Sequence, residues 1–213
     1  MNLFITGTDT GVGKTYVASL LVNAMRQHGV NAIGMKPICC GDRDDAEALR
    51  RAGNGTAALN DINPIWFRTP AAPYAATIVE NRSMDLELIR EAFARLSAAY
   101  EAVVVEGAGG WLVPITREFS MADLAVEFGL PVIVVAANRL GAINHTLLTI
   151  NAVRAMGMQC AGIVVNQPIA AQDPLATATN RSVLEHLLPG IEILEIAHDS
   201  GTIAFPPAWI TRR

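Results

Sequence analysis

The sequence contains little charge and no excess of basic residues. Of its 213 residues, 17% are charged, and the formal net charge at pH 7 is −4. Proteins that bind nucleic acid or an anionic membrane surface usually carry clustered lysine and arginine. We therefore expect neither kind of partner, and any anion site must be local and built from a few residues.

Long apolar runs and a basic leader are also missing. No apolar run reaches the ~18 residues that a membrane span needs, although 51% of the residues are hydrophobic. The first residues, MNLFITGTD, contain no basic segment and only a short apolar run, unlike a secretory signal. We expect a cytoplasmic protein.

Cysteines are few as well. Cys39, Cys40 and Cys160 make an odd number, and thiols in the cytoplasm usually stay reduced. The adjacent pair Cys39 and Cys40 lacks the spacing of a zinc site. We expect free thiols.

What the sequence does contain is an alternation of short apolar runs with amphipathic stretches. Apolar runs predict strands at 3–6, 31–37, 102–107, 131–137, 160–167 and 191–197. Helical spacing predicts helices at 14–28, 42–53, 84–100, 120–129, 144–157 and 174–188. Proline-rich 65–76 is predicted as a surface loop, in which 69–73 is either a lid or a fixed segment. The tail, 199–213, shows no period.

Apolar strands separated by helices are typical of an α/β fold, with a mainly parallel sheet and helices on both faces. The length fits a single domain over residues 1–213. Ligands of such sheets bind beyond the carboxyl ends of the strands. The segments at those ends are glycine-rich or polar, and we expect the chemistry there: 6–15, 36–41, 106–111, 138–145 and 166–167.

The segment GTDTGVGKT, residues 7–15, nearly matches the phosphate-loop pattern of a glycine, four residues and Gly-Lys-Thr. Thr8 stands where the first glycine is usual, which a negative φ would permit. A strand before the loop and a helix from Lys14 offer N–H groups and a positive dipole end to phosphate. We predict a P-loop nucleoside triphosphate hydrolase-like fold, with Lys14 on the terminal phosphates and Thr15 on magnesium.

Charged residues stand at two further strand ends. Glu106 follows three valines and precedes Gly-Ala-Gly-Gly, which favours a magnesium ligand over a solvated glutamate. Lys36 is either a solvated strand end or a second cation beside Lys14 that assists phosphoryl transfer. An acidic cluster follows and either solvates a helix N-terminus or joins the site: Asp42, Asp44 and Asp45.

Several segments together resemble the dethiobiotin synthetase family of biotin biosynthesis, from residue 2 to about 196: TGTDTGVGKT, MKP, VEGAGGWLVP, ADLA, LGAINHTLLT and GIVVNQ. EGAGGW with its following proline, and LG-x-INH, are far more specific than the P-loop. The resemblance implies that 7,8-diaminononanoate and carbon dioxide form a carbamate, that ATP phosphorylates it, and that the second amine closes a cyclic urea. It also implies magnesium and a homodimer.

The resemblance further assigns roles to residues. Those implied as catalytic, near phosphate and carbamate, are Lys14, Lys36 and Thr10. Those implied in nucleotide binding are Gly11, Val12, Gly13, Lys14, Thr15, Tyr16 and, on the nucleobase, Asn166. Those implied in substrate binding are Thr10, Lys36, Cys40, Gly109, Leu140, Gly141 and Asn144, with segment 140–145 reaching the neighbouring subunit's substrate. The implied magnesium ligands are Thr15, Asp45 and Glu106. His145 is a helix-start residue in this interpretation.

Three features depart from the family's pattern. Gly11 stands where some members carry glutamate, and Cys40 stands where a serine is frequent. After the last predicted strand, LEIAHDSG replaces a Gly-x-Ile-Pro-x-Leu segment that lies near the base. Strict preference for ATP is therefore left open.

Three other functions compete with this interpretation. A partition or septum-site ATPase would carry a lysine early in the loop, where this chain has Thr8, Asp9 and Thr10. An amidotransferase-linked ligase of cobalamin synthesis needs a further domain, for which 213 residues leave no room. Glu106 and Lys36 disfavour a non-catalytic nucleotide-binding module without excluding it.

Overall fold

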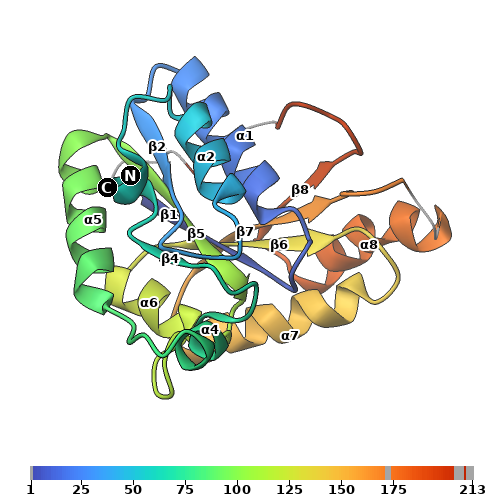
Figure 1. The fold of residues 1–213 in the computed structure, drawn as a ribbon. Coiled ribbons are helices and arrows are strands. Elements are labelled where there is room, and N and C mark those ends of the chain that lie inside the picture. The colour runs from blue at the N-terminus through green and yellow to red at the C-terminus, as the bar shows by residue number, and fades with distance from the viewer. Residues whose placement is uncertain (1, 171–173, 204–208, 210–213) are drawn as a thin grey trace.

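The structure is a computed structural model that describes residues 2–170, 174–203 and 209. Figure 1 shows a layer of strands with helices packed against it. The elements, in chain order, are β1 (Asn2–Gly7), α1 (Lys14–Gln27), β2 (Ala32–Met35), β3 (Ile38–Cys40), α2 (Asp44–Ala52), α3 (Leu59–Ile62), β4 (Ile65–Phe67), α4 (Pro73–Val79), α5 (Leu86–Ala99), β5 (Ala102–Gly110), α6 (Met121–Phe128), β6 (Val132–Ala137), α7 (Ala142–Ala155), β7 (Cys160–Asn166), α8 (Pro174–Leu187) and β8 (Glu192–Ile196).

Six of the described strands form one parallel sheet in the order β2-β5-β1-β6-β7-β8. β1 lies in the middle, between β5 and β6. The chain first moves from β1 to one edge of the sheet and later crosses β1 toward the other edge. The loop after β1 therefore lies at the point where the winding direction reverses, which is where open parallel sheets bind ligands.

Helices cover both faces of this sheet, as the apolar strands predicted. α1 and α2 lie over one face, and α6, α7 and α8 lie over the other (Figure 1). Right-handed crossovers explain why α1 lies opposite α6, α7 and α8, because connections that move in opposite directions along the sheet must pass over opposite faces. α2 belongs to the longer connection from β2 to β5 and packs beside α1. Within the described ranges, no helix is long and apolar enough to cross a bilayer.

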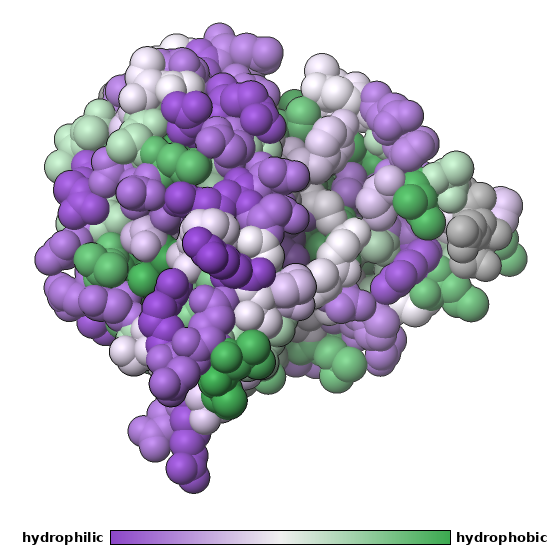
Figure 2. Space-filling view, in the orientation of Figure 1, coloured by the Kyte–Doolittle hydropathy of each residue, from purple (hydrophilic) through white to green (hydrophobic). Residues whose placement is uncertain are grey.

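The central strands are buried because both of their faces are covered. Every residue of β6 and the first six residues of β5 are buried. This burial explains the unbroken apolar runs in the sequence, because alternation appears only where one strand face meets water. On the face shown in Figure 2, hydrophilic residues predominate and apolar ones form small separate groups.

The predicted ends of the helix at 120–129 are confirmed. The Ser120 and Asp123 side chains accept hydrogen bonds from each other's backbone N–H groups, which is a capping box. Gly129 follows the helix with a φ of 63°, a left-handed conformation that suits glycine.

The prediction of a loop over 65–76 holds for 68–72 but was wrong at both ends. β4 lies in this segment and pairs in parallel with β3 in a separate two-stranded sheet, and α4 begins at Pro73. Proline is favoured in the first turn of a helix because the missing N–H would have no helical partner there. The predicted strand at 31–37 is shorter than expected, since β2 spans Ala32–Met35, and a separate strand, β3, begins at Ile38.

The tail at 199–213, for which no element was predicted, lies largely outside the described residues. Within 204–213 the structure describes Trp209, which is 4% exposed. Its indole packs on Gly162 near the start of β7, where a Cβ would lie 2.1 Å from the ring. That residues 1–213 form one domain stays a prediction.

Candidate active site

The loop between β1 and α1 curls at the carboxyl edge of the sheet. Gly11 and Gly13 have φ angles of 73° and 89°, which glycine adopts without a Cβ clash. Thr8 is not among the described residues with a positive φ, so the backbone tolerates threonine in place of the usual glycine. α1 begins at Lys14, and the unpaired N–H groups of its first turn are available to an anion.

A cavity of about 690 Å³ opens beside this loop. Its walls also include the ends of β2 and β5, the β3 strand, the start of α2 and segment 70–73. The predicted site residues that it brings together are Thr10, Gly11, Gly13, Lys14, Thr15, Lys36, Cys40, Asp45, Glu106 and Gly109.

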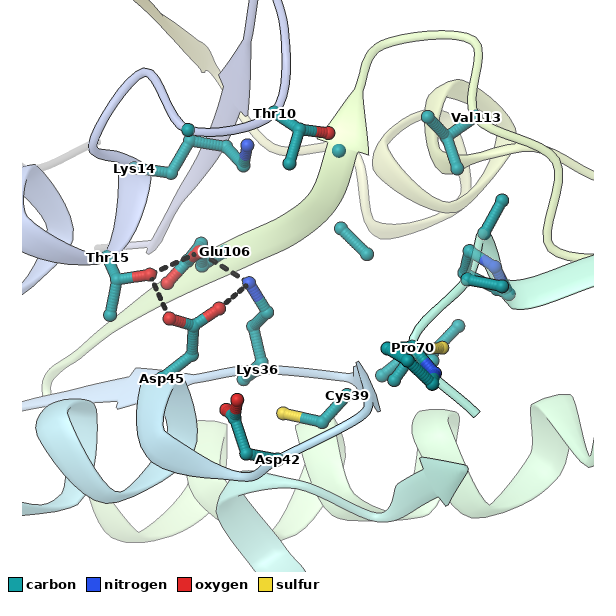
Figure 3. A pocket seen from close by; sticks show the side chains of 18 of the residues that line it. Thr10, Lys14, Thr15, Lys36, Cys39, Asp42, Asp45, Pro70, Glu106 and Val113 are labelled. Atoms are coloured by element: carbon teal, nitrogen blue, oxygen red, sulfur yellow. Dashed lines mark hydrogen bonds and ion pairs between the residues drawn. The ribbon is translucent and has the colours of Figure 1, made fainter. Parts of the chain in front are cut away.

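Four side chains meet in this cavity, from α1, α2, β5 and the connection after β2 (Figure 3). The Lys36 Nζ atom lies 2.5 Å from Glu106 Oε1 and 2.7 Å from Asp45 Oδ2. The Thr15 hydroxyl lies 2.7 Å from Asp45 Oδ1 and 2.9 Å from Glu106 Oε1, so it can donate its proton to either carboxylate. Lys36 is therefore a buried member of this cluster and not a solvated strand end.

Burial and ion pairing act in opposite directions on Lys36. Its side chain is 5% exposed and that of Glu106 is 1% exposed. Burial alone would lower the pKa of Lys36, but Glu106 and Asp45 outweigh it and raise that pKa above its usual value. The same lysine outweighs the effect of burial on Asp45 and lowers the pKa of that carboxyl group. Burial raises the pKa of the Glu106 carboxyl group, and the nearby Lys36 ammonium group opposes that rise. Lys36 and Asp45 are therefore charged at neutral pH and form an ion pair.

Lys14 lies across the cavity from Lys36 (Figure 3), and its Nζ donates to the Asp9 carbonyl oxygen at 3.2 Å. Burial, followed by the nearby positive charge of Lys36, lowers the pKa of Lys14 to about 8. An anion beside Lys14 would favour its charged form. Lys14 and Lys36 are the two lysines of the whole chain, a signal in the sequence that points to both.

Thr15, Asp45 and Glu106 could hold a divalent cation. Glu106 Oε2 is buried and has no hydrogen-bond partner among the described residues. A hydroxyl and two carboxylates suit magnesium, which usually takes few protein ligands and completes its shell with water and phosphate oxygens. The described residues include no cluster of three or more histidine, cysteine, aspartate or glutamate side chains arranged for a metal.

Asn166, at the end of β7, contacts the backbone of the P-loop. Its side chain is buried and donates a hydrogen bond to the Val12 carbonyl oxygen at 2.9 Å. A Cβ added to Gly13 would lie 2.2 Å from the same amide nitrogen, so glycine is needed there for space as well as for φ. Sequence reasoning missed this contact, and nucleobase binding by Asn166 stays a prediction.

Some predicted residues lie outside the cavity lining. Tyr16 accepts a hydrogen bond from the Gly201 N–H at 2.9 Å, so the segment after β8 packs at the start of α1. Leu140, which is 74% exposed, precedes α7, and Gly141 and Asn144 also do not line the cavity. Their predicted contact with a second subunit's substrate stays a prediction.

The lining also includes residues to which the sequence assigned no definite role. Segment 70–73 forms one wall of the cavity, together with Cys39, Asp42 and Val113. Burial raises the pKa of the Cys40 thiol to about 11, so this thiol stays protonated and offers only a weak hydrogen bond.

The chain is similar to known proteins over most of its length. A family model described as an AAA domain matches residues 1–195. An ATP-dependent dethiobiotin synthetase BioD of Akkermansia muciniphila is 47% identical over 197 residues, which cover 92% of each chain. A protein of the same name from Endomicrobium trichonymphae is 34% identical over 99% of this chain and 98% of its own.

Solved structures with a similar fold share less sequence. A ParA family ATPase from Chlorobium tepidum is 13% identical, with a TM-score of 0.55, and the match covers 92% of this chain and 85% of that one. The hydrogenase maturation factor HypB from Archaeoglobus fulgidus is 15% identical, with a TM-score of 0.52 over 92% and 80% of the two chains. Similarity at this level shows a P-loop fold alone. The relatives that span nearly the whole of both chains decide the family, and this chain belongs to the dethiobiotin synthetases.

Proposed function

We propose that this protein converts 7,8-diaminononanoate, carbon dioxide and ATP to dethiobiotin, ADP and phosphate. One amino group takes up carbon dioxide as a carbamate, and a carbamate oxygen accepts the γ-phosphoryl group. The second amine then attacks the carbonyl carbon and expels phosphate, which closes the cyclic urea. The observation that carries the proposal is the convergence of Lys14 and Lys36 on one cavity beside the P-loop.

The residues of this cavity suit phosphoryl transfer, which needs mainly positioning and charge stabilisation. Lys14 and Lys36 supply positive charge from two sides, and the N–H groups at the start of α1 bind phosphate. Gly109 has a φ of 65°, and its Cβ position lies 3.8 Å from Thr10 Oγ1. We assign Thr10 to the carbamate and the γ-phosphate, and Gly109 and Cys40 to the diamine.

Magnesium fits the donor set of Thr15, Asp45 and Glu106, because Glu106 Oε2 is a buried acceptor without a partner among the described residues. Bound there, magnesium would neutralise charge on the phosphate oxygens. The chain's own contribution is to hold these three oxygens together from α1, α2 and β5.

Further parts of the proposal concern the partners. Leu140, Gly141 and Asn144 would contact the substrate of the second subunit in a homodimer, and Tyr16 and Asn166 would lie beside the nucleoside. We propose a cytoplasmic enzyme without nucleic-acid or membrane partners.

Product analysis tests the reaction. The protein is incubated with diaminononanoate, ¹³C-bicarbonate, magnesium and ATP, and dethiobiotin is sought by mass spectrometry. We expect dethiobiotin with one heavy carbon and an equal amount of phosphate. Phosphate release without dethiobiotin would refute the proposal and favour a switch ATPase.

A lysine variant tests the site. Lys36→Ala should abolish ring closure while circular dichroism shows a retained fold. Arg50→Ala is the matched control, because it removes a surface ion pair with Glu47 on the neighbouring α2 helix and should leave turnover unchanged. Normal turnover by Lys36→Ala would exclude the proposed role of Lys36.

A nucleotide panel tests the base preference that LEIAHDSG leaves open. Product formation with ATP but not CTP would show that the site reads adenine. Equal rates with ATP and CTP would show that the site, with its atypical LEIAHDSG segment, does not distinguish adenine from cytosine.

A further inference from the structure

We infer that the Lys36 ammonium group occupies the metal site until magnesium binds, and that magnesium then releases it toward the reacting groups. The inference rests on the proposed function, because it takes Thr15, Asp45 and Glu106 as the metal ligands. The Lys36 Nζ atom already contacts two of them, at 2.5 Å from Glu106 Oε1 and 2.7 Å from Asp45 Oδ2.

A divalent ion held by the same two carboxylates would lie beside the ammonium group of Lys36. The Lys36 and Glu106 side chains are 5% and 1% exposed, so water screens little of the repulsion between two cations placed there. The Thr15 hydroxyl must also turn, because it now directs its proton at the carboxylates and a metal needs its lone pairs. A magnesium ion held by these residues therefore displaces the ammonium group.

The backbone of Lys36 cannot follow this displacement. Its N–H donates to the Ile62 carbonyl oxygen at 2.8 Å, and its own carbonyl oxygen accepts from the Asn63 side chain at 2.9 Å. The movement is therefore a rotation of the side chain alone.

The cavity offers space for that rotation. Lys36 lines the cavity of about 690 Å³. Figure 3 shows its nitrogen directed at Asp45 and Glu106, and the Lys14 side chain lies above it in the view. A rotation away from the two carboxylates brings the ammonium group into the open space of the cavity. In the proposed reaction, this space holds the carbamate and the γ-phosphate.

This exchange makes Lys36 available only in the metal-loaded site. Without metal, two carboxylates neutralise the charge of Lys36. Among the described lining residues, Lys14 is then the remaining cation that can bind an anionic ligand. With magnesium bound, the carboxylates are engaged and both lysines face the cavity. Binding of magnesium therefore precedes productive binding of the carbamate.

The chain's two lysines make a spectroscopic test direct. Protein labelled with ¹³C at lysine Cε gives two side-chain signals, which the Lys14→Met and Lys36→Met variants assign. Magnesium chloride is added to the wild-type protein without nucleotide, and calorimetry reports binding. We expect the Lys36 signal to shift clearly more than the Lys14 signal. Magnesium binding with an unchanged Lys36 signal would overturn the inference.

Metal affinity provides a second test. Lys36→Met removes the competing cation and should bind magnesium at least about tenfold more tightly than the wild type. Lys14→Met is the matched control, because it also removes a charge from the cavity but not one that contacts the carboxylates. Its affinity should change by no more than about threefold. An unchanged or weaker affinity of Lys36→Met, or equal tightening in both variants, would contradict the exchange.

Failure of the inference and failure of the proposed function look different. Should Lys36 stay in place after magnesium binds, the labelled dethiobiotin would still form, because the product assay reports the reaction and not the position of the side chain. Should Lys36→Met unfold, the wild-type lysine signals still decide the question.

Discussion

The side-chain amide of Asn166 donates a hydrogen bond to the carbonyl oxygen of Val12, at 2.9 Å, across 154 positions of sequence. Through this contact, the end of β7 fixes the backbone of the P-loop. The loop is thus shaped by its neighbouring strand as well as by its own glycines.

Asn166→Ala should therefore weaken phosphate binding as well as stability. The substitution leaves a loop carbonyl without its partner, which typically costs about 1–3 kcal/mol. Calorimetry should show that inorganic triphosphate and ATP both bind more weakly. Asn151→Ala, at an exposed position of α7, is the control and should change neither property. Weaker binding of ATP alone would mean that Asn166 acts only on the base.

Two P-loop glycines should differ in their tolerance of alanine. Both have positive φ angles, but a Cβ at Gly11 meets nothing within 4 Å, whereas one at Gly13 lies 2.2 Å from the Asn166 amide. Gly11→Ala should cost about 1–2 kcal/mol of folding free energy from backbone strain alone. Gly13→Ala should cost more and abolish nucleotide binding. Urea unfolding measures the folding free energy of both variants. Equal losses of folding free energy would show that the space beside Gly13 is not limiting.

Nucleotide binding should take up protons in mildly alkaline solution. The pKa of Lys14 lies at about 8, below its usual 10.5, so the free protein loses this proton as the pH rises through 8. A bound phosphate raises the pKa again. Binding should then take up roughly three quarters of a proton at pH 8.5 and roughly a tenth at pH 7.

Calorimetry in buffers of different ionisation enthalpy measures this uptake. Lys14→Met provides the control, because the uptake should disappear with the lysine. Equal uptake at the two pH values would mean that the pKa of Lys14 is not lowered in the free protein.

Gly162 and Trp209 should be energetically coupled. A Cβ on Gly162 would lie 2.1 Å from the indole ring, so Gly162→Ala should expel Trp209 and shift its fluorescence to the red. Gly162→Ala and Trp209→Ala should each destabilise the protein, and the double variant should lose less than the sum. Additive losses in urea unfolding would show that the two residues do not contact each other.

Local sequence patterns predicted the α/β class, the order of most strands and helices, and the P-loop. These features are local, since a valine run, a helical period or the spacing of Gly13, Lys14 and Thr15 depends on neighbouring residues alone. Local patterns were weakest at short elements such as β3, β4 and α4, because a proline can open a helix as well as interrupt one.

How the site residues combine depends on contacts between segments that are far apart in the sequence. Lys36 and Glu106 stand 70 positions apart, and the pattern around Lys36 is compatible with a solvated strand end. The two residues meet because β2 and β5 are neighbours in the sheet, and burial then requires each charge to find a partner. Strand order and burial, which no local pattern contains, made Lys36 part of a buried ion pair and made Asn166 a support of the P-loop.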